Sequence, residues 1–193
     1  MKLVLGSNSP RRKEILNKTG YDFIVQKSSI DENIEGELLP ADIVSKLALK
    51  KARAVIEKLT IKEDAAIIGA DTLVVFKEEI LGKPQDASEA YLMLSKLKNS
   101  WHEVYTGIAV VGTAGGEYVF YEKTKVHMKN YDDKIIWDYI KTKEPLDKAG
   151  AYGIQGKGAF LVDKIEGDYL NVVGLPLTKL GEILAEKFGI TPF

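Results

Sequence analysis

Hydrophobic and polar positions alternate along this chain with two spacings, one typical of strands and one typical of helices. Ile67–Phe76 is an apolar, β-branched run bounded by charged residues, which predicts a buried strand. Pro40–Leu59 instead repeats its apolar residues at about 100° per residue, which predicts an amphipathic helix. Its apolar stripe consists of Val44, Leu47, Ala48, Ala52, Val55 and Leu59. Lys51 falls within this stripe, whereas Lys50 lies near its edge and Arg53 lies outside it.

The remaining elements are short, and their order decides the fold class. We expect helices over Pro10–Thr19, Ala87–Leu97, Asp132–Thr142 and Leu175–Phe188. We expect strands over Leu3–Leu5, Tyr21–Gln26, Glu79–Leu81, Trp101–Val111, Glu117–Met128 and Ala159–Ile165. Lys143–Gly158 is expected to lie over a cleft, and Glu166–Gly174 is expected to be loop. Because strands and helices mix without strict βαβ alternation, we predict an α/β fold with a twisted mixed β-sheet flanked by helices.

Composition narrows the class of protein. A chain of 193 residues suits one domain, or one domain with two lobes. With 27 basic and 28 acidic side chains the net charge is −1, so nucleic acid is not an expected partner. The absence of cysteine excludes disulfides, thiolate metal sites and a cysteine nucleophile, and it is compatible with the cytosol. No apolar run approaches the roughly 18 residues of a membrane span, so we expect a cytoplasmic protein without a membrane partner.

Asp71 is the first candidate for chemistry, because it interrupts the apolar run of the predicted central strand. A carboxylate in such a strand must be hydrogen-bonded, paired with a cation or bound to a metal, since desolvating it alone costs several kcal/mol. One interpretation places Asp71 at the floor of a polyphosphate site. The alternative is that Asp71 caps a turn where the strand bends at Gly69.

Ser7-Asn8-Ser9-Pro10-Arg11-Arg12 leads from a strand into a helix N-terminus. Free backbone N–H groups, the positive end of the helix dipole, small hydroxyls and two guanidinium groups together favour an anion site. Arg12 shares a helix side with Ile15, Leu16 and Thr19, so we expect it to face inward. The alternative is a capped surface helix with solvated arginines.

Further candidates are weaker when taken singly. Lys51 is unusual inside an apolar stripe, although its stem could reach solvent, and Lys83 lies in a turn. Glu32 could share a divalent cation with Asp71, because Mg²⁺ needs only one or two carboxylates beside phosphate oxygens and water; otherwise it belongs to a solvated loop. Gly150–Gly158 allows close approach to a ligand but does not match a phosphate-binding P-loop. Convergent cations with one carboxylate suggest hydrolysis of a nucleotide polyphosphate.

These features occur within a series of motifs that runs through nearly the whole chain. They are Ser7–Arg12, Lys51–Arg53, Gly69–Thr72, Leu81–Pro84, His102–Gly107, Glu144–Gly156 and Asn171–Pro176. In this order the motifs closely resemble the Maf proteins, which are septum formation inhibitor-like nucleotide pyrophosphatases. Asn8 is a small departure, since glycine or another small residue is common there.

The resemblance implies a single domain over residues 1–193, with a fold shared with inosine triphosphatases and a cleft between two lobes. It implies cleavage of a nucleoside triphosphate substrate to the monophosphate and pyrophosphate with a divalent cation, Mg²⁺ or Mn²⁺. Asp71 aligns with the proton acceptor. Arg12, Thr72 and Gln155 align with positions that separate the branches of the family, and their combination resembles the branch that acts on dTTP and UTP rather than 7-methyl-GTP.

Both lines of reasoning lead to the same predicted mechanism. Asp71 activates water for attack on the α-phosphorus, directly or through a metal held also by Glu32. The groups expected to bind phosphate are Ser7, Ser9, Arg11, Arg12, Lys51 and Lys83. Gln155 offers a donor and an acceptor to a pyrimidine edge. The alternatives are a non-catalytic regulator of septum formation that binds nucleotide or nucleic acid, and a purine pyrophosphatase of the ITP type; a homodimer is left open.

Overall fold

The computed structural model describes residues 1–33, 36, 38–60 and 63–193. The strands are β1 (Lys2–Leu5), β2 (Phe23–Val25), β3 (Ala65–Phe76), β4 (Glu79–Leu81), β5 (Trp101–Gly112), β6 (Glu117–Met128) and β7 (Val162–Glu166). Among the described residues they form a seven-stranded sheet in the order β2-β1-β3-β5-β6-β7, with β4 paired to β3. Strand β1 is parallel to β2 and β3, whereas β4 and β7 are antiparallel to their neighbours. The predicted mixed sheet is therefore confirmed.

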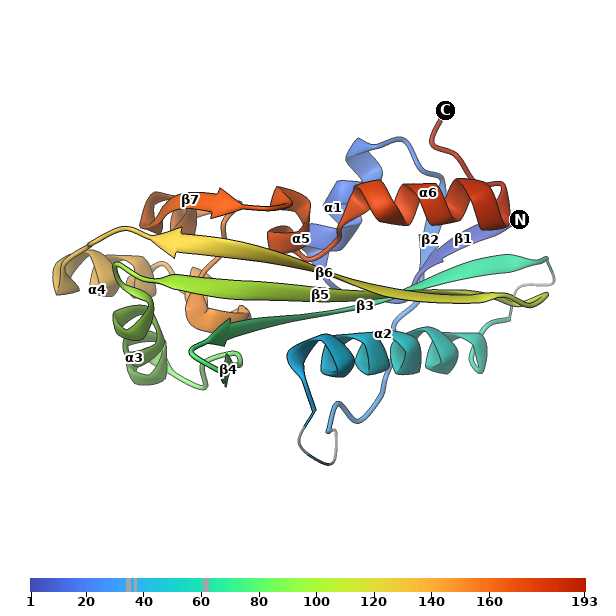
Figure 1. The fold of residues 1–193 in the computed structure, drawn as a ribbon. Coiled ribbons are helices and arrows are strands. Elements are labelled where there is room, and N and C mark those ends of the chain that lie inside the picture. The colour runs from blue at the N-terminus through green and yellow to red at the C-terminus, as the bar shows by residue number, and fades with distance from the viewer. Residues whose placement is uncertain (34–35, 37, 61–62) are drawn as a thin grey trace. The chain divides into compact units, whose positions relative to one another are not determined.

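Helices flank the sheet (Figure 1), and those that begin at Pro10, Pro40 and Ala87 start where the sequence predicts. They are α1 (Pro10–Lys18), α2 (Pro40–Ile56), α3 (Ala87–Leu97), α4 (Asp133–Lys141), α5 (Tyr169–Val173) and α6 (Leu177–Phe188). Three short 3₁₀ turns follow α4, namely η1 (Glu144–Asp147), η2 (Ala149–Ala151) and η3 (Lys157–Leu161). In the described part of the chain, no helix has both the length and the apolar character needed to cross a bilayer.

The chain divides into two compact units. The first unit contains Met1–Asp71, Thr106–Glu122 and Gly174–Phe193, and the second contains Thr72–Tyr105 and Lys123–Val173. Strands β3, β5 and β6 contribute residues to both units. Each unit has a hydrophobic core of its own.

In the first unit, helices α2 and α6 lie on opposite faces of the strands (Figure 1). The stripe of α2 packs on β3 and β5, as the burial of Ala48, Ala52 and Val55 shows. On α6, Phe188 meets the ring of Tyr118 edge to face at 5.7 Å. The amphipathic pattern of the sequence therefore predicted which side of α2 is buried, including the position of Lys51.

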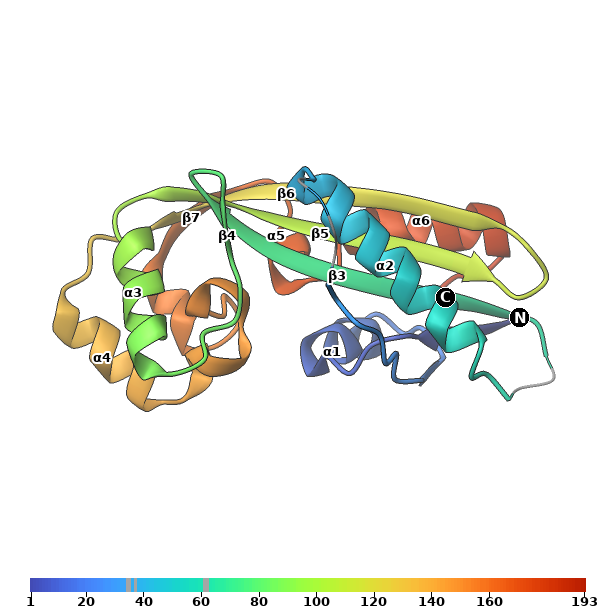
Figure 2. The same cartoon turned by 90° about the horizontal axis from the view of Figure 1, so that it is seen from below.

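In the second unit, helices α3 and α4 pack against each other and against the 3₁₀ turns (Figure 2). Asp86 and Asp132 cap these helices by accepting a hydrogen bond from the backbone amide three residues further along. Their shared core gathers side chains from both helices, from β3–β7 and from the turns, among them Val74 of β3 and Tyr139 of α4.

Two predictions for the C-terminal third are wrong in part. Ala159–Ile165 begins not as a strand but as the end of η3, because the Ala159 amide bonds back to the carbonyl of Gly156. Pairing with β6 starts only at Val162, opposite Met128. The predicted loop over Glu166–Gly174 contains α5, where Asp168 accepts the amide of Leu170 in the manner of an N-cap.

Candidate functional site

Asp71 lies in the first unit on β3, which continues without a break from Ala65 to Phe76. The strand does not turn at Gly69, so the capping alternative is wrong. Asp71 is 8% exposed, and its Oδ1 accepts a hydrogen bond of 2.6 Å from Nζ of Lys51, which is 9% exposed. The prediction of a buried carboxylate paired with a cation is confirmed.

The ammonium of Lys51 also reaches a second carboxylate. Its Nζ lies 2.7 Å from Oε1 of Glu32, whose side chain is largely exposed. Burial raises the pKa of Asp71 above its ordinary value, although Lys51 and Arg12 act in the opposite direction. A carboxylate with a raised pKa is a better proton acceptor than an ordinary surface aspartate.

Helix α2 brings Lys51 to Asp71 because the helix and β3 approach unusually closely. A methyl group at Gly69 would lie 2.0 Å from the carbonyl oxygen of Ala48 and 2.7 Å from the amide nitrogen of Ala52. These two alanines flank Lys51 on α2, and Gly69 precedes Asp71 by two residues on the same face of β3. The glycine therefore sets the separation that lets the ammonium reach the carboxylate.

Arg12 is held in the same unit by groups from three segments. Its Nε donates to the carbonyl of Gly174 at 2.8 Å, and its Nη1 donates to the carbonyl of Ala70 and to Oγ of Ser7, both at 3.1 Å. Burial lowers the pKa of this guanidinium to about 10, and the charge of Asp71 counteracts that shift. The group remains positive at neutral pH, and the predicted inward orientation of Arg12 is confirmed.

The hydroxyls of the N-terminal motif are organised around this arginine. Ser7 is buried and accepts hydrogen bonds from Arg12 and from the Ser9 amide. Ser9 caps α1 by accepting the Arg12 amide at 3.5 Å, with Pro10 as the first helical residue. Arg11 is half-buried beside them. The structure thus brings Ser7, Ser9, Arg12, Lys51, Glu32 and Asp71 together within one unit.

Lys83, Thr72 and Gln155 belong to the second unit. Lys83 is exposed, next to Gly82, whose carbonyl accepts the amide of Gly150 at 3.0 Å. Thr72 is half-buried on β3, and Gln155 is exposed in the turn before η3. Their roles remain predictions.

Sequence reasoning missed several groups that organise these residues. The carbonyls of Ala70 and Gly174 could not be recognised as acceptors for Arg12, because backbone groups leave no signature in residue type. In the second unit it missed Glu144 and Tyr139, which bond to the segment around Gln155. The only available signal was that Glu144 opens the motif that ends at Gly156.

Glu32 and Asp71 are the residues predicted to hold a divalent cation. The described ranges contain no group of three or more His, Asp or Glu side chains with the arrangement of a metal site. Glu32 and Asp71 do converge on one position, which the ammonium of Lys51 takes. Two carboxylates that meet at one cation are the hard oxygen donors that Mg²⁺ combines with phosphate oxygens and water, so these residues fit such an ion.

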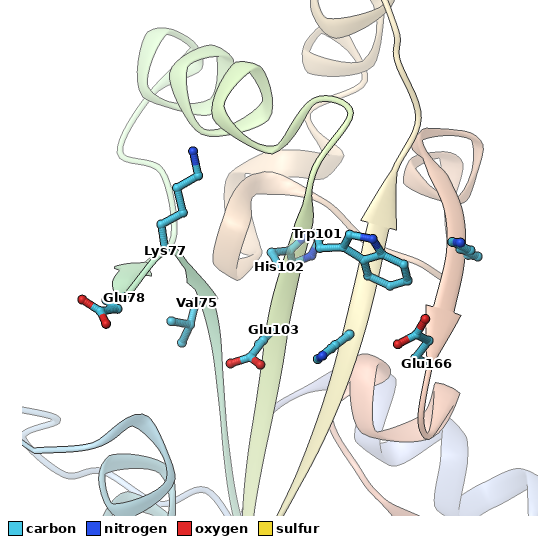
Figure 3. A pocket seen from close by; sticks show the side chains of 9 residues that line it. Val75, Lys77, Glu78, Trp101, His102, Glu103 and Glu166 are labelled. Atoms are coloured by element: carbon cyan, nitrogen blue, oxygen red, sulfur yellow. The ribbon is translucent and has the colours of Figure 1, made fainter.

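A cavity of about 650 Å³ lies within the second unit (Figure 3). It is lined by Val75, Lys77, Glu78, Trp101, His102, Glu103, Lys125, Lys164 and Glu166. Three lysines and three glutamates give the lining no net charge, and none of the predicted site residues is among them. This cavity therefore offers no preference for a polyanion.

Comparisons with known proteins agree with the motifs. A family model described as Maf-like protein matches residues 2–187. A dTTP/UTP pyrophosphatase of Thermoanaerobacter sp. (strain X514) is 50% identical over 191 residues, which cover 98% of each chain. A dTTP/UTP pyrophosphatase of Moorella thermoacetica is 52% identical over 190 residues, which cover 98% of this chain and 96% of the relative.

Two solved structures overlap with this chain only in part. The nucleoside-triphosphatase / dITP/XTP pyrophosphatase of Mycobacterium abscessus is 17% identical, with a TM-score of 0.43 over 68% of this chain and 76% of its own. The Ham1 protein of Staphylococcus aureus is 14% identical, with a TM-score of 0.46 over 67% of this chain and 73% of its own.

Proposed function

Because the chain belongs to the Maf-like protein family, we propose that it hydrolyses dTTP and UTP to the monophosphate and pyrophosphate. The relatives that carry this activity in their names match it at about half of all positions and over almost their full length. The observation on which the proposal rests is the buried Asp71, paired with Lys51 and accompanied by the charge of Arg12. We propose that both units belong to one functional domain, since the family model includes residues of each.

In the proposed reaction, a water oxygen attacks the α-phosphorus and the bond from this phosphorus to the bridging oxygen breaks. Asp71 accepts the proton of the attacking water, and pyrophosphate departs with the electron pair of the broken bond. The raised pKa of Asp71 supports its role as the base. The charges of Arg11, Arg12, Lys51 and Lys83 stabilise the negative charge that grows on the leaving group.

Ser7, Ser9 and the first amides of α1 are proposed to bind phosphate oxygens. Small hydroxyls and backbone N–H groups at a helix start suit a phosphate, and the position of Ser9 at the N-terminus of α1 supports this role. Arg12 is proposed to contact the phosphates from the position in which Ala70 and Gly174 hold it. Arg12, Thr72 and Gln155 are proposed to select the nucleotide, with Gln155 against the base.

Glu32 and Asp71 are proposed to hold Mg²⁺ or Mn²⁺. When bound, such an ion supplies positive charge that polarises a phosphate oxygen and lowers the pKa of water. The residues of the chain orient the substrate, and Asp71 accepts the proton at a carboxylate oxygen.

The proposal is tested by pyrophosphate release from a panel of dTTP, UTP, CTP, ITP and GTP, with and without Mg²⁺, for the wild type and Asp71→Asn. We expect turnover of dTTP and UTP by the wild type and a loss of about 10²- to 10⁴-fold in kcat for the variant, which removes the base while keeping its shape. Asp22→Asn, a change at an exposed aspartate of the same unit, serves as the matched control and keeps wild-type kcat.

Each contrary result has a definite meaning. Turnover that persists in Asp71→Asn excludes Asp71 as the base. A preference for ITP means that the enzyme is a purine pyrophosphatase, and no release from any nucleotide favours a non-catalytic regulator.

A further inference from the structure

The segment that carries Gln155 is short, polar and rich in glycine, yet it is anchored at both ends within the second unit. Before Gln155, the Gly153 amide donates to the hydroxyl of Tyr139 at 3.1 Å, and Ile154 packs against the hydrophobic core. After it, the amides of Lys157 and Gly158 donate to the carboxylate of Glu144. Gln155 itself is exposed between these anchors.

Glu144 is the acceptor that closes the second anchor. Its Oε2 accepts the Lys157 amide at 3.0 Å, and its Oε1 accepts the Gly158 amide at 3.1 Å and the Tyr139 hydroxyl at 2.9 Å. Tyr139 therefore links the two anchors, because its hydroxyl donates to Glu144 and accepts from Gly153. One carboxylate and one phenol thus hold both ends of the turn.

The backbone on the C-terminal side of Gln155 lies so close to Glu144 and Tyr139 that Gly156 and Gly158 have no room for a side chain. A methyl group at Gly156 would lie 2.5 Å from Oε1 of Glu144, and one at Gly158 would lie 2.6 Å from the Tyr139 hydroxyl. These glycines let the main chain fold directly over the two side chains, which is why the segment is compact rather than a flexible loop.

The chemistry of this anchor requires a carboxylate rather than an amide. All three partners of Glu144 are donors, and an ionised carboxylate accepts at both oxygens, whereas a glutamine would aim an N–H group at another donor. Burial opposes ionisation of Glu144, but the hydrogen bonds from Lys157, Gly158 and Tyr139 outweigh burial, and the pKa of Glu144 is lowered. Glu144 is therefore negatively charged at neutral pH.

We propose that Glu144 is a positioning residue for nucleotide selection, which holds the turn of Gln155 so that the glutamine amide meets the base at a fixed place. This inference rests on the proposed function, in which Gln155 contacts the base. A uracil or thymine edge and a cytosine edge differ in the order of donors and acceptors, so discrimination between them depends on where the amide is held. Without the anchor, the turn adapts to either edge and selectivity falls.

The test is the ratio of kcat/KM for UTP to kcat/KM for CTP in the wild type and in Glu144→Gln, which keeps the shape but breaks the acceptor pattern. We expect the ratio to fall about fivefold, the effect of losing roughly one hydrogen bond. For UTP, we expect KM to rise while kcat is maintained, because contacts to the base contribute equally to the ground state and the transition state. Glu166→Gln, an exposed glutamate of β7 in the same unit, is the matched control and keeps the wild-type ratio.

A double-mutant cycle with Gln155→Ala decides whether Glu144 acts through Gln155. We expect Gln155→Ala to lower the UTP/CTP ratio about tenfold, and Glu144→Gln to lower it no further in that background. Tyr139→Phe, which removes the hydroxyl shared by both anchors, shifts the ratio in the same direction as Glu144→Gln.

Several outcomes overturn the inference. An unchanged ratio in Glu144→Gln overturns it, as does a loss by one common factor for all nucleotides together with a lower Tm, since that is a purely structural effect. A further loss in the Gln155→Ala background shows that Glu144 acts elsewhere, and an unchanged ratio in Gln155→Ala itself removes the premise. Failure of the proposed function is distinct, because it shows already in the wild type as no release of pyrophosphate.

Discussion

At the scale of single residues, the ammonium of Lys51 between Asp71 and Glu32 is the central interaction of the first unit. Asp71 and Lys51 are both buried, so neither charge is solvated by bulk water. Removing one partner of a buried pair leaves the other uncompensated, which costs more than the pair itself contributes. Lys51 therefore stabilises Asp71 in its ionised form, and a metal ion bound by the two carboxylates would have to replace or displace this ammonium.

Lys51→Met is expected to lower the free energy of unfolding at pH 8 by about 3 kcal/mol, because Asp71 loses its cation. Removing Lys51 raises the pKa of Asp71 further, so the variant regains stability as the pH falls through that raised value and the carboxyl group becomes neutral. Urea denaturation at several pH values between 8 and 5 measures this.

Lys50→Met provides the matched control for this prediction. Lys50 lies on the same helix, is exposed and donates only to the carbonyl of Asp31 among the described residues. We also expect added Mn²⁺ to restore part of the stability of Lys51→Met, since the ion substitutes for the missing ammonium at Glu32 and Asp71. This account is contradicted if Lys51→Met is as stable as the wild type at pH 8, or if added Mn²⁺ does not change the stability of Lys51→Met.

At the scale of elements, the contact of α2 with the sheet decides whether the site forms. A methyl group at Gly69 of β3 would lie within 2.7 Å of Ala48 and Ala52, and one at Gly107 of β5 would lie 2.3 Å from the carbonyl oxygen of Val44. The helix thus rests on two glycines of adjacent strands, and both contacts lie inside the first unit. Because the closest neighbouring atoms at both glycines belong to the backbone of α2, no side chain can rotate to make room, and an added methyl group must displace the helix itself.

Gly69→Ala is expected to destabilise the protein by about 2 to 3 kcal/mol, because the added methyl group overpacks a rigid contact. It is also expected to lower turnover, since α2 must move away from β3 and takes Lys51 with it. Thermal denaturation and pyrophosphate release measure the two effects. Gly82→Ala, where a methyl group meets nothing within 4 Å, is the control for stability, and equal stability of the two variants would contradict the prediction.

At the scale of the whole molecule, the buried histidine of the second unit makes global stability depend on pH. His102 is 1% exposed and its Nε2 lies 2.7 Å from the hydroxyl of Tyr152. Burial lowers the pKa of His102 to about 4, whereas an unfolded chain protonates this residue near its ordinary value. Unfolding therefore takes up a proton below about pH 6.5, and the folded state loses stability as the pH falls from there to about 4.

The wild type is expected to lose up to about 3 kcal/mol more than His102→Gln between pH 7 and pH 4. Urea denaturation across this range measures the free energy of unfolding of both proteins. The difference between wild type and variant isolates the effect of His102, because groups such as Asp71, which gain stability as the pH falls, are present in both. If the free energy of unfolding of the wild type and of His102→Gln depends on pH in the same way, His102 does not titrate as described.

Local sequence determined most of the elements and much of the candidate chemistry. Helical periodicity identified the buried face of α2 and put Lys51 on it, and Ser9-Pro10 identified the start of α1. The apolar run around Asp71 identified β3, and the order of motifs identified the family. Apart from the order of the motifs, these features are local, because capping, periodicity and β-branching act within a few residues. The cytoplasmic location and the homodimer remain predictions.

Only the tertiary structure decided which of these groups meet. Arg12 bonds to a carbonyl that lies 162 residues away, Lys51 reaches the carboxylate of Asp71, and Glu144 holds the amides of a turn beyond its own helix. The same contacts explain the wrong strand prediction at Ala159, where the turn anchored by Glu144 overrode local β-propensity. Hydrogen bonds and close backbone contacts between distant segments depend on distance in space, which no local pattern of residue types encodes.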